Sequence, residues 1–151
     1  MVLIRPFCVC CVLNETLIFF SPLSTNHQNQ WMEQAGAIVA TRLTRKHVIT
    51  AGFDRMSFQK PAKVGSLLTF QARATRVFGK SLEVLVRVYC FSGGNMMDPD
   101  FTNEGYFSFT TLDEEKQPVA VGLQVRPSTD EEKKDYCEAM QRRDKRMKEQ
   151  P

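Results

Sequence analysis

Residues 24–42, STNHQNQWMEQAGAIVATR, contain the side chains of this chain that are best suited to chemistry. A polar cluster with Asn26 and His27 is followed by Trp31 and Glu33, and then by small and apolar residues at helical spacing. A carboxylate near the start of a buried helix lies beside backbone N–H groups without a helical partner. Glu33 therefore has two interpretations: a base that works while these N–H groups hold a substrate oxygen, or an acid that only complements the helix dipole.

Three common kinds of site are absent from the sequence. It contains no Gly-rich phosphate loop, no G-x-S-x-G turn and no cluster of residues with metal-ligand spacing. We therefore predict no metal and no bound cofactor. His47 begins a strand-like tract and is expected to be structural, whereas the role of His27, beside the junction, stays open.

Composition limits the chain to one ordinary domain. Its 151 residues are 42% hydrophobic and 25% charged, which is enough for a single core. A formal net charge of +3 is too small to indicate nucleic-acid binding. The five cysteines are an odd number without the paired spacing of a zinc site, so we expect reduced thiols in a reducing compartment.

The first 16 residues are predicted to be a poorly specified leader that runs into a strand at 17–20. Pro6 and the pair Asn14 and Glu15 interrupt its apolar residues, so no run approaches the roughly 20 residues that a membrane span needs. A cleaved signal peptide is the alternative interpretation. The three cysteines of this tract are expected to be buried or incidental thiols.

After the leader, the sequence predicts one helix followed by strands. Apolar and small residues at helical spacing predict a largely buried helix over 31–43. Tracts rich in β-branched and aromatic residues, separated by turn residues, predict strands over 47–58, 66–78, 81–91, 104–112 and 118–122. Alternate residues from Leu82 to Val88 are apolar, so this strand is expected to have one fully apolar face.

Residues 128–149 begin with STDEE and end with RRDKRMK, which predicts a C-terminal helix whose end charges complement its dipole. We expect this helix to be solvated, and an anion-binding element is the alternative. A long buried helix followed by antiparallel strands predicts an α+β architecture in which the sheet wraps the helix.

Three blocks carry a family resemblance in the expected order: WMEQAGAIVATR, VITAGFDRMSFQKPAKVGSLLTFQARATRVFGKSLEVLVRV and FSFTTLDEEKQPVAV. In these residues the sequence resembles the hotdog-fold acyl-CoA thioesterases, the group that includes the brain-type cytosolic acyl-CoA hydrolases and their short bacterial relatives. The resemblance implies an antiparallel sheet wrapped around a long central helix. It also implies hydrolysis of fatty acyl-CoA to free fatty acid and coenzyme A. A single hotdog domain is expected over 17–126, with a helical tail over 127–151.

The resemblance also assigns roles to individual residues. Glu33 occupies the position of the family's acidic residue in the central helix, and Asn26, within PLSTNH, matches the asparagine of the preceding loop. Both are implied to be catalytic, with each site drawing groups from both subunits of a dimer. Lys80 and Ser81 match the turn near coenzyme A. Further cations are candidates for the same contact: Arg76 on the adjoining strand and, as weaker ones, Lys60 and Lys63.

The chain departs from the family between Asn26 and Glu33. Relatives have a glycine-rich stretch there, whereas only residues 27–32 intervene in this chain, roughly eight fewer or about two helical turns. Three explanations stay open: a transcript or gene model that lacks the segment, an inactive chain whose helix starts late, and an active variant with a rerouted loop. The alternative function is therefore an impaired hotdog subunit that dimerises or binds acyl-CoA without turnover.

The expected partners follow from the same resemblance. They are acyl-CoA and further copies of the chain, as a homodimer or a trimer of dimers. No nucleic acid and no stable membrane insertion are expected. The cytoplasm is the expected location, with mitochondria as the alternative.

Overall fold

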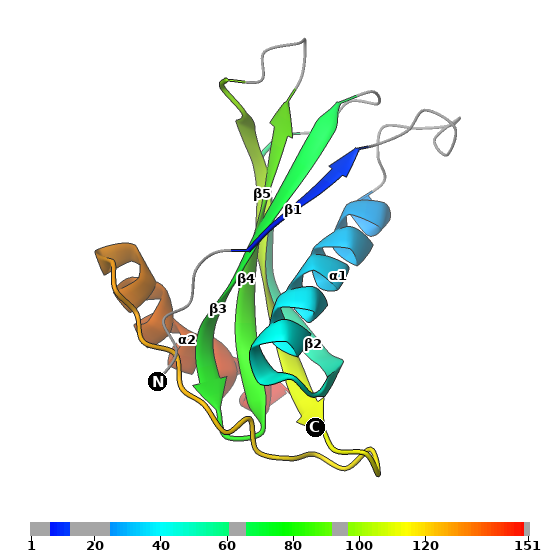
Figure 1. Cartoon of the computed structure of the whole chain (residues 1–151). Helices are drawn as coiled ribbons and strands as arrows, with labels where there is room; N and C mark the ends of the chain where they lie inside the picture. Colours follow the sequence, from blue (N-terminus) through cyan, green and yellow to red (C-terminus); the bar gives the residue numbers. More distant parts are fainter. Residues whose placement is uncertain (1–6, 13–24, 61–65, 92–96, 150–151) are drawn as a thin grey trace.

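The computed structural model describes residues 7–12, 25–60, 66–91 and 97–149, and for residues 7–12, 25–27, 55 and 58 it describes the backbone only. These residues form an antiparallel sheet with a helix on each side (Figure 1). The elements are β1 (Phe7–Val12), α1 (Thr25–Thr44), β2 (His47–Phe58), β3 (Leu67–Phe78), β4 (Ser81–Phe91), β5 (Asp100–Leu112) and α2 (Asp130–Glu149).

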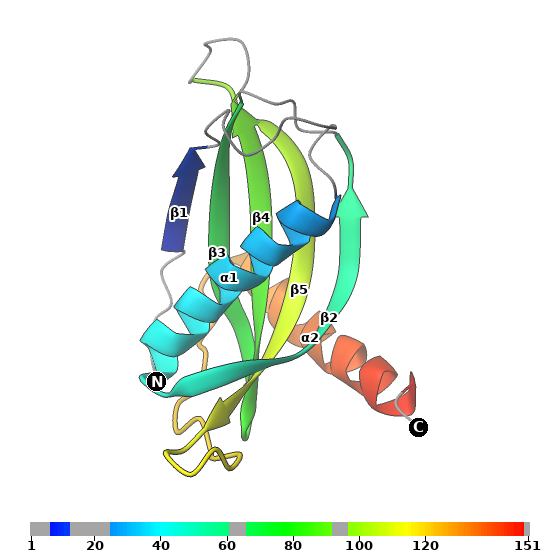
Figure 2. The same ribbon diagram turned by 90° about the vertical axis from the view of Figure 1, so that its right-hand side faces the viewer.

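The five strands lie in the order β1-β3-β4-β5-β2, so β1 and β2 are the two edges of the sheet. All neighbouring strands are antiparallel. The sheet curves around α1, whereas α2 lies against the opposite face (Figure 2). This arrangement confirms the predicted α+β fold with a sheet wrapped around a helix.

Helix α1 packs closely on the sheet because its buried face has small residues, Ala35, Gly36 and Ala40, at the closest approach. A Cβ atom at Gly36 would lie 3.0 Å from the ring of Phe109, so a larger residue there would push the helix away. Met32 is fully buried, and Trp31 packs edge to face on Phe70 with 6.4 Å between the ring centroids. These contacts fix the helix that carries Glu33.

The predicted elements differ from the structure mainly at the two ends of the chain. The strands over 47–58 and 81–91 are confirmed, and those predicted over 66–78 and 104–112 are present with slightly different first residues. Helix α1 begins at Thr25 rather than at residue 31. The strand predicted at 17–20 lies outside the described residues, and strand β1 lies within the predicted leader.

The short strand predicted over 118–122 is wrong. Only an isolated bridge between Leu112 and Pro118 forms there. The N–H of Val119 donates to the carbonyl of Thr111, whereas the N–H of Val121 donates to Gly79 on another hairpin. Because the segment divides its hydrogen bonds between strand β5 and the turn that joins β3 to β4, it forms no continuous ladder.

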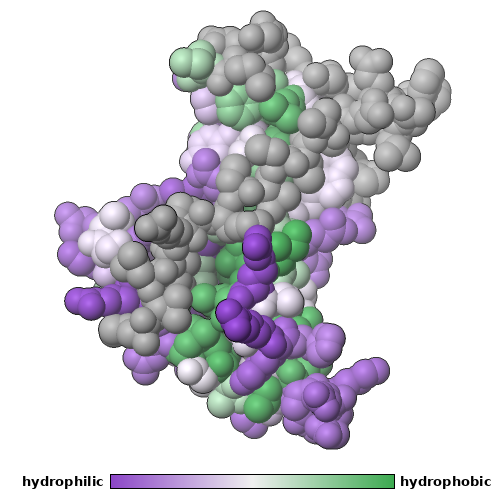
Figure 3. Space-filling view, in the orientation of Figure 1, coloured by the Kyte–Doolittle hydropathy of each residue, from purple (hydrophilic) through white to green (hydrophobic). Residues whose placement is uncertain are grey.

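The prediction of a solvated C-terminal helix is also wrong. Asp135 and Ala139 of α2 are buried against the outer face of the sheet. Hydrophilic side chains gather over α2, and apolar surface lies over the lower part of the sheet between the two helices (Figure 3). The charged face of α2 looks solvated in the sequence, but in the fold its charges meet opposite charges on β3 and β4.

The centre of this contact is Glu83, whose side chain is fully buried. Arg142 of α2 donates to both carboxylate oxygens of Glu83 at 3.0 and 2.8 Å, and the Thr75 hydroxyl donates to Oε1 at 2.5 Å. The Arg142 guanidinium also lies 3.7 Å from the centroid of the Tyr106 ring. A fixed charge pair therefore joins the middle of α2 to the central strand β4.

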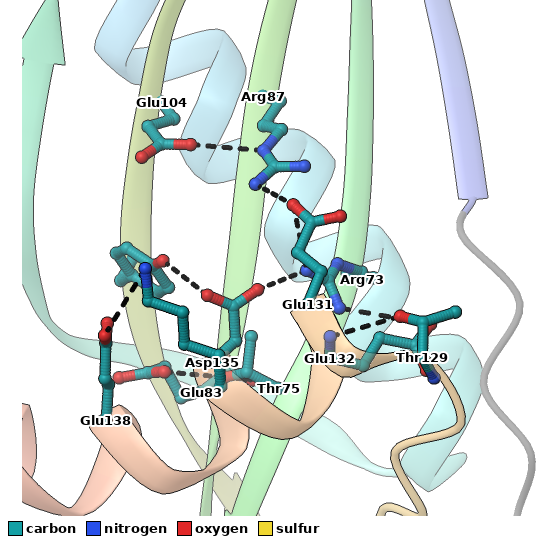
Figure 4. A network of polar contacts seen from close by, with 12 residues as sticks. Arg73, Thr75, Glu83, Arg87, Glu104, Thr129, Glu131, Glu132, Asp135 and Glu138 are labelled. Carbon is teal, nitrogen blue, oxygen red and sulfur yellow. Dashed lines mark hydrogen bonds and ion pairs between the residues drawn. The ribbon is translucent and has the colours of Figure 1, made fainter.

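A second group of charges holds the first half of α2 (Figure 4). Arg73 donates to Asp135, and the hydroxyl of Tyr106 donates to the same carboxylate at 3.0 Å. Arg87 bridges Glu104 of β5 and Glu131 of α2. Burial, together with the charge of Asp135, raises the pKa of Tyr106, so this tyrosine stays protonated as a donor.

We expect the substitution Glu83→Ala to lower the free energy of unfolding by about 3–5 kcal/mol, because it removes the buried carboxylate that accepts two hydrogen bonds from the largely buried Arg142, which keeps only the partly exposed Glu138 and the Asp135 carbonyl. Chemical denaturation measures this loss. The control is Glu149→Ala, in an exposed pair with Lys145 at 3.7 Å, for which the expected loss is below about 1 kcal/mol. Similar small losses in both variants would contradict a central role for Glu83.

The first turn of α2 should be sensitive to acid. Hydrogen bonds from the N–H and hydroxyl of Ser128 lower the pKa of Glu132, which also accepts from the N–H of Thr129. This stabilisation is present above the unfolded-state pKa of about 4.3 and is lost as pH falls through the lower folded-state pKa.

The stability difference between the unsubstituted chain and Glu132→Gln should therefore be largest near neutral pH and shrink toward pH 3. Denaturation at several pH values measures it, and Glu115→Gln in the exposed turn before Pro118 serves as the control. A difference independent of pH would contradict the role of the ionised Glu132.

Candidate active site

Glu33 lies well inside α1 rather than in its first turn. The helix begins at Thr25, and its first turn contains no acidic residue. The backbone N–H groups around Glu33 are therefore used within the helix, and the free ones lie about two turns earlier. This corrects the expectation that the N–H groups beside Glu33 could hold a substrate oxygen.

The partner of Glu33 is Thr50 on the edge strand β2. The hydroxyl of Thr50 donates to Oε1 of Glu33 at 2.5 Å. Thr50 is exposed and Glu33 is partly exposed, so solvent reaches this pair. The result is a carboxylate that is oriented through one oxygen and accessible to water, which is the arrangement that a general base or a nucleophile needs.

Thr50 was missed by the sequence analysis. It lies in a tract rich in β-branched residues, where a threonine is ordinary and carries no signal of its own. Its contact with Glu33 joins residues 17 positions apart, and periodicity within one element does not report such a pair.

The second predicted catalytic residue, Asn26, lies in the first turn of α1. Its side chain, like that of His27, is outside the described part of the structure. Asn26 and Glu33 are on one helix, about 10 Å apart along its axis and two turns away from each other. Joint action of these two residues stays a prediction.

The predicted coenzyme A contacts lie away from Glu33 within one chain. Arg76 donates to the carbonyl of Tyr136 at 3.0 Å, and its guanidinium lies 4.1 Å from the Tyr136 ring centroid, so it holds α2 on the outer face. Lys80 is exposed in the turn between β3 and β4. Ser81, next to it, makes a long hydrogen bond of 3.5 Å to the carbonyl of Phe78.

Of the weaker candidates for this contact, Lys60 pairs with Asp100 at 2.6 Å. Lys63 lies outside the described residues. The assignment of any of these cations to coenzyme A stays a prediction.

A cleft of about 540 Å³ opens two turns further along α1, where the helix ends and β2 begins. Its lining combines basic, acidic and apolar side chains: Thr41, Arg45, Lys46, His47, Leu112, Asp113, Glu114 and Val119. Lys46 donates to the carbonyl of Ala120 at 2.5 Å, which uses one of its donors. His47, predicted to be structural, lies on this lining.

The described residues contain neither a metal-binding cluster nor a membrane-spanning helix. No group of three His, Cys, Asp or Glu side chains is placed to hold a metal ion within 7–12, 25–60, 66–91 and 97–149. In the same ranges, neither helix combines the length and the apolar character needed to cross a membrane.

Comparison with known proteins shows a family similarity. Residues 29–96, which contain Glu33 and Thr50, match the sequence profile of the family described as "Thioesterase superfamily". Over this stretch the chain is similar to the thioesterase superfamily. Its fold agrees, because the acyl-CoA hydrolase of Staphylococcus aureus superposes with a TM-score of 0.84 at 26% identity, covering 95% of this chain and 87% of the hydrolase.

Curated acyl-CoA thioesterases show similarity in sequence. Mouse acyl-coenzyme A thioesterase 11 is 28% identical over 141 residues, which are 88% of this chain and 24% of the mouse protein. An uncharacterized acyl-CoA thioester hydrolase of Bacillus subtilis is 28% identical over 136 residues, which are 83% of this chain and 76% of the bacterial protein. The chain thus spans about a quarter of the length of the mouse relative and most of the bacterial one.

Proposed function

We propose that this chain is an acyl-CoA thioesterase, which hydrolyses fatty acyl-CoA to free fatty acid and coenzyme A. The observation that carries the proposal is the hydrogen bond from Thr50 to Glu33 on a hotdog scaffold. The names of the similar proteins support the substrate class, and the Staphylococcus aureus hydrolase was solved with butyryl coenzyme A and coenzyme A bound.

The spacing of residues gives independent support. Structures exist of variants of that hydrolase in which an asparagine, an aspartate or a threonine is replaced by alanine. The aspartate and the threonine are 17 positions apart, as Glu33 and Thr50 are. The asparagine precedes the aspartate by 15 positions, whereas Asn26 precedes Glu33 by 7. The acidic residue and the threonine thus have the same spacing in both chains, whereas the segment between the asparagine and the acidic residue is shorter in this chain.

The proposed reaction uses Glu33 as a general base. Glu33 takes a proton from water, the resulting hydroxide adds to the thioester carbonyl carbon, and a tetrahedral oxyanion forms. The oxyanion collapses, the carbon–sulfur bond breaks, and the coenzyme A sulfur receives the proton from Glu33. Thr50 orients the carboxylate throughout. Direct attack by the carboxylate is the other route open to the same geometry.

The oxyanion needs donors, and the start of α1 supplies them. The N–H groups of the first helical turn have no helical acceptor, and Asn26 is in this turn. We propose that Asn26 and these N–H groups act on a site of the partner subunit, because Asn26 is two turns from Glu33 of its own chain.

An impaired subunit is the second candidate function. The shorter connector between Asn26 and Glu33 favours it, since the missing residues precede the site in the chain. Such a chain would form the hotdog dimer and bind acyl-CoA without turnover.

We expect Glu33→Gln to lower kcat by about 10²–10⁴-fold, as is typical for loss of a general base. Thr50→Val should lower kcat less, by roughly 10-fold, because the carboxylate remains but loses its orienting donor. Release of free thiol from acyl-CoAs of different chain length measures both, with Glu115→Gln as the control. Turnover that persists in Glu33→Gln would remove this residue from the mechanism, and binding without turnover by the unsubstituted chain would favour the impaired subunit.

We further propose a dimer formed through the edge of β2. This strand has 12 residues and one neighbour in the sheet, and its side chains Ile49 and Phe53 are 51% and 65% exposed. A long apolar edge next to Glu33 and Thr50 favours pairing with a second copy. Similar acyl-CoA thioesterases solved as hexamers support a trimer of dimers.

Phe53→Lys should convert the dimer to a monomer, because it places a charge on the proposed interface. Sedimentation velocity measures the change. The matched control is Met147→Lys, which adds the same charge at a position of α2 that is 64% exposed. An unchanged oligomer in Phe53→Lys would exclude this edge as the interface.

Two assignments accompany the proposed dimer. Lys80, Ser81 and Arg76 are proposed to contact coenzyme A. Rat and human relatives named as cytosolic support a cytoplasmic location, with mitochondria as the alternative.

A further inference from the structure

Thr50 lies directly before a short segment of β2, residues 52–54, whose pairing with β5 is interrupted on both sides. Register shifts occur between Thr50 and Gly52 and again between Asp54 and Ser57. Among the described strands of one chain, β2 pairs with β5 alone. Bulges leave ladder hydrogen bonds unmade and bend the strand. Contacts outside the ladder therefore add to the hold of β5 on the stretch from Thr50 to Asp54.

Helices on both faces of the sheet provide these contacts. On the inner face, Thr50 donates to Glu33 of α1. On the outer face, Arg146 of α2 donates to Asp54, and their side chains are only 15% and 19% exposed. The strand bends sharply where α2 passes behind it (Figure 2). The bulged segment is thus held from two sides.

Arg146 also connects this segment to the centre of the sheet. Its Nη1 lies 3.8 Å from Oε2 of Glu83, which Arg142 and Thr75 already hold in place. The Cδ of Arg146 would lie 3.8 Å from a Cβ at Gly52, so the arginine covers the bulge at van der Waals distance. A planar guanidinium that reaches two carboxylates ties the edge strand to β4 independently of β5.

We propose that Arg146 is a positioning residue, which holds Thr50 beside Glu33 through its ion pair with Asp54. Arg146 is on α2 and Glu33 is on α1, on opposite faces of the sheet, so the arginine acts only through β2. The catalytic consequence rests on the proposed function, whereas the anchoring of the segment does not.

The kinetic test is a double-mutant cycle with Arg146→Gln and Thr50→Val. Arg146→Gln should lower kcat by about 10-fold in the unsubstituted chain, with little change in KM, but by less than about 2-fold in the Thr50→Val background. Asp54→Asn should lower kcat as much as Arg146→Gln does. The losses of kcat from these two substitutions should not be additive in the double variant. Arg146→Lys should recover part of kcat because it retains the charge.

The matched control is Arg143→Gln. Arg143 lies on the same helix but packs over the ring of Phe78, with its Cζ 5.0 Å from the ring centroid, and has no contact with β2 among those described. Its replacement should leave kcat unchanged. A loss of kcat by Arg146→Gln that is equal in both Thr50 backgrounds would show a merely structural role and overturn the proposal.

A second measurement does not depend on activity. Backbone hydrogen exchange over residues 50–54 should become about 10-fold faster in Arg146→Gln, while exchange over 84–88 of β4 stays unchanged. Unchanged exchange over 50–54 would overturn the anchoring itself. If the unsubstituted chain shows no turnover, the proposed function fails, and the exchange result alone decides whether Arg146 holds this segment.

Discussion

The close approach of α1 to the concave face of the sheet is the constraint on which the structure depends. Gly36 lets the helix backbone reach the ring of Phe109, and a Cβ at this position would already meet the ring at 3.0 Å. Since packed interiors transmit displacements, a helix held further out would carry Glu33 away from the edge strand. The apolar contact on one flank of α1 thus decides the geometry of a polar contact on its other flank.

The two faces of the sheet are covered by different physical means. The inner face buries apolar side chains against α1, whereas the outer face buries Glu83 and pairs it with Arg142. Desolvation makes a buried ion pair a weak source of net stability, but its geometry is demanding. The ionic contacts therefore define the register of α2 on the sheet more than they contribute to the free energy of folding.

The sequence allowed most of the fold to be predicted, because burial dictates the helical spacing of α1 and the alternation in β4. The prediction failed at polar and charged residues that are buried in the structure. The polar residues before Trp31 hid the true start of α1, although Gln28 is only 4% exposed in the structure. The charged face of α2 resembled a solvated surface because its partners, such as Glu83, lie on another element.

Only one residue of the pair Glu33 and Thr50 was predicted from the sequence. Glu33 could be found because a local pattern and a family resemblance both point to it. Thr50 could not, since it becomes a partner only after β2 folds back along α1. The catalytic role of Asn26 stays a prediction, whereas its predicted place in a loop before the helix is wrong, because it lies in the first turn of the helix that carries Glu33.

The strand order has a consequence for how the chain folds. β3 and β4 form a hairpin whose closing pair, Phe78 and Ser81, is three residues apart, whereas β2 must wait for β5, with His47 opposite Leu112. Contacts between residues far apart in the sequence form late, because the entropy cost of closing the long loop between them must be met before the contacts stabilise the chain. We therefore expect β2 to join the sheet after the hairpin has formed. Substitutions around Thr50 would then mainly speed unfolding and leave the folding rate nearly unchanged.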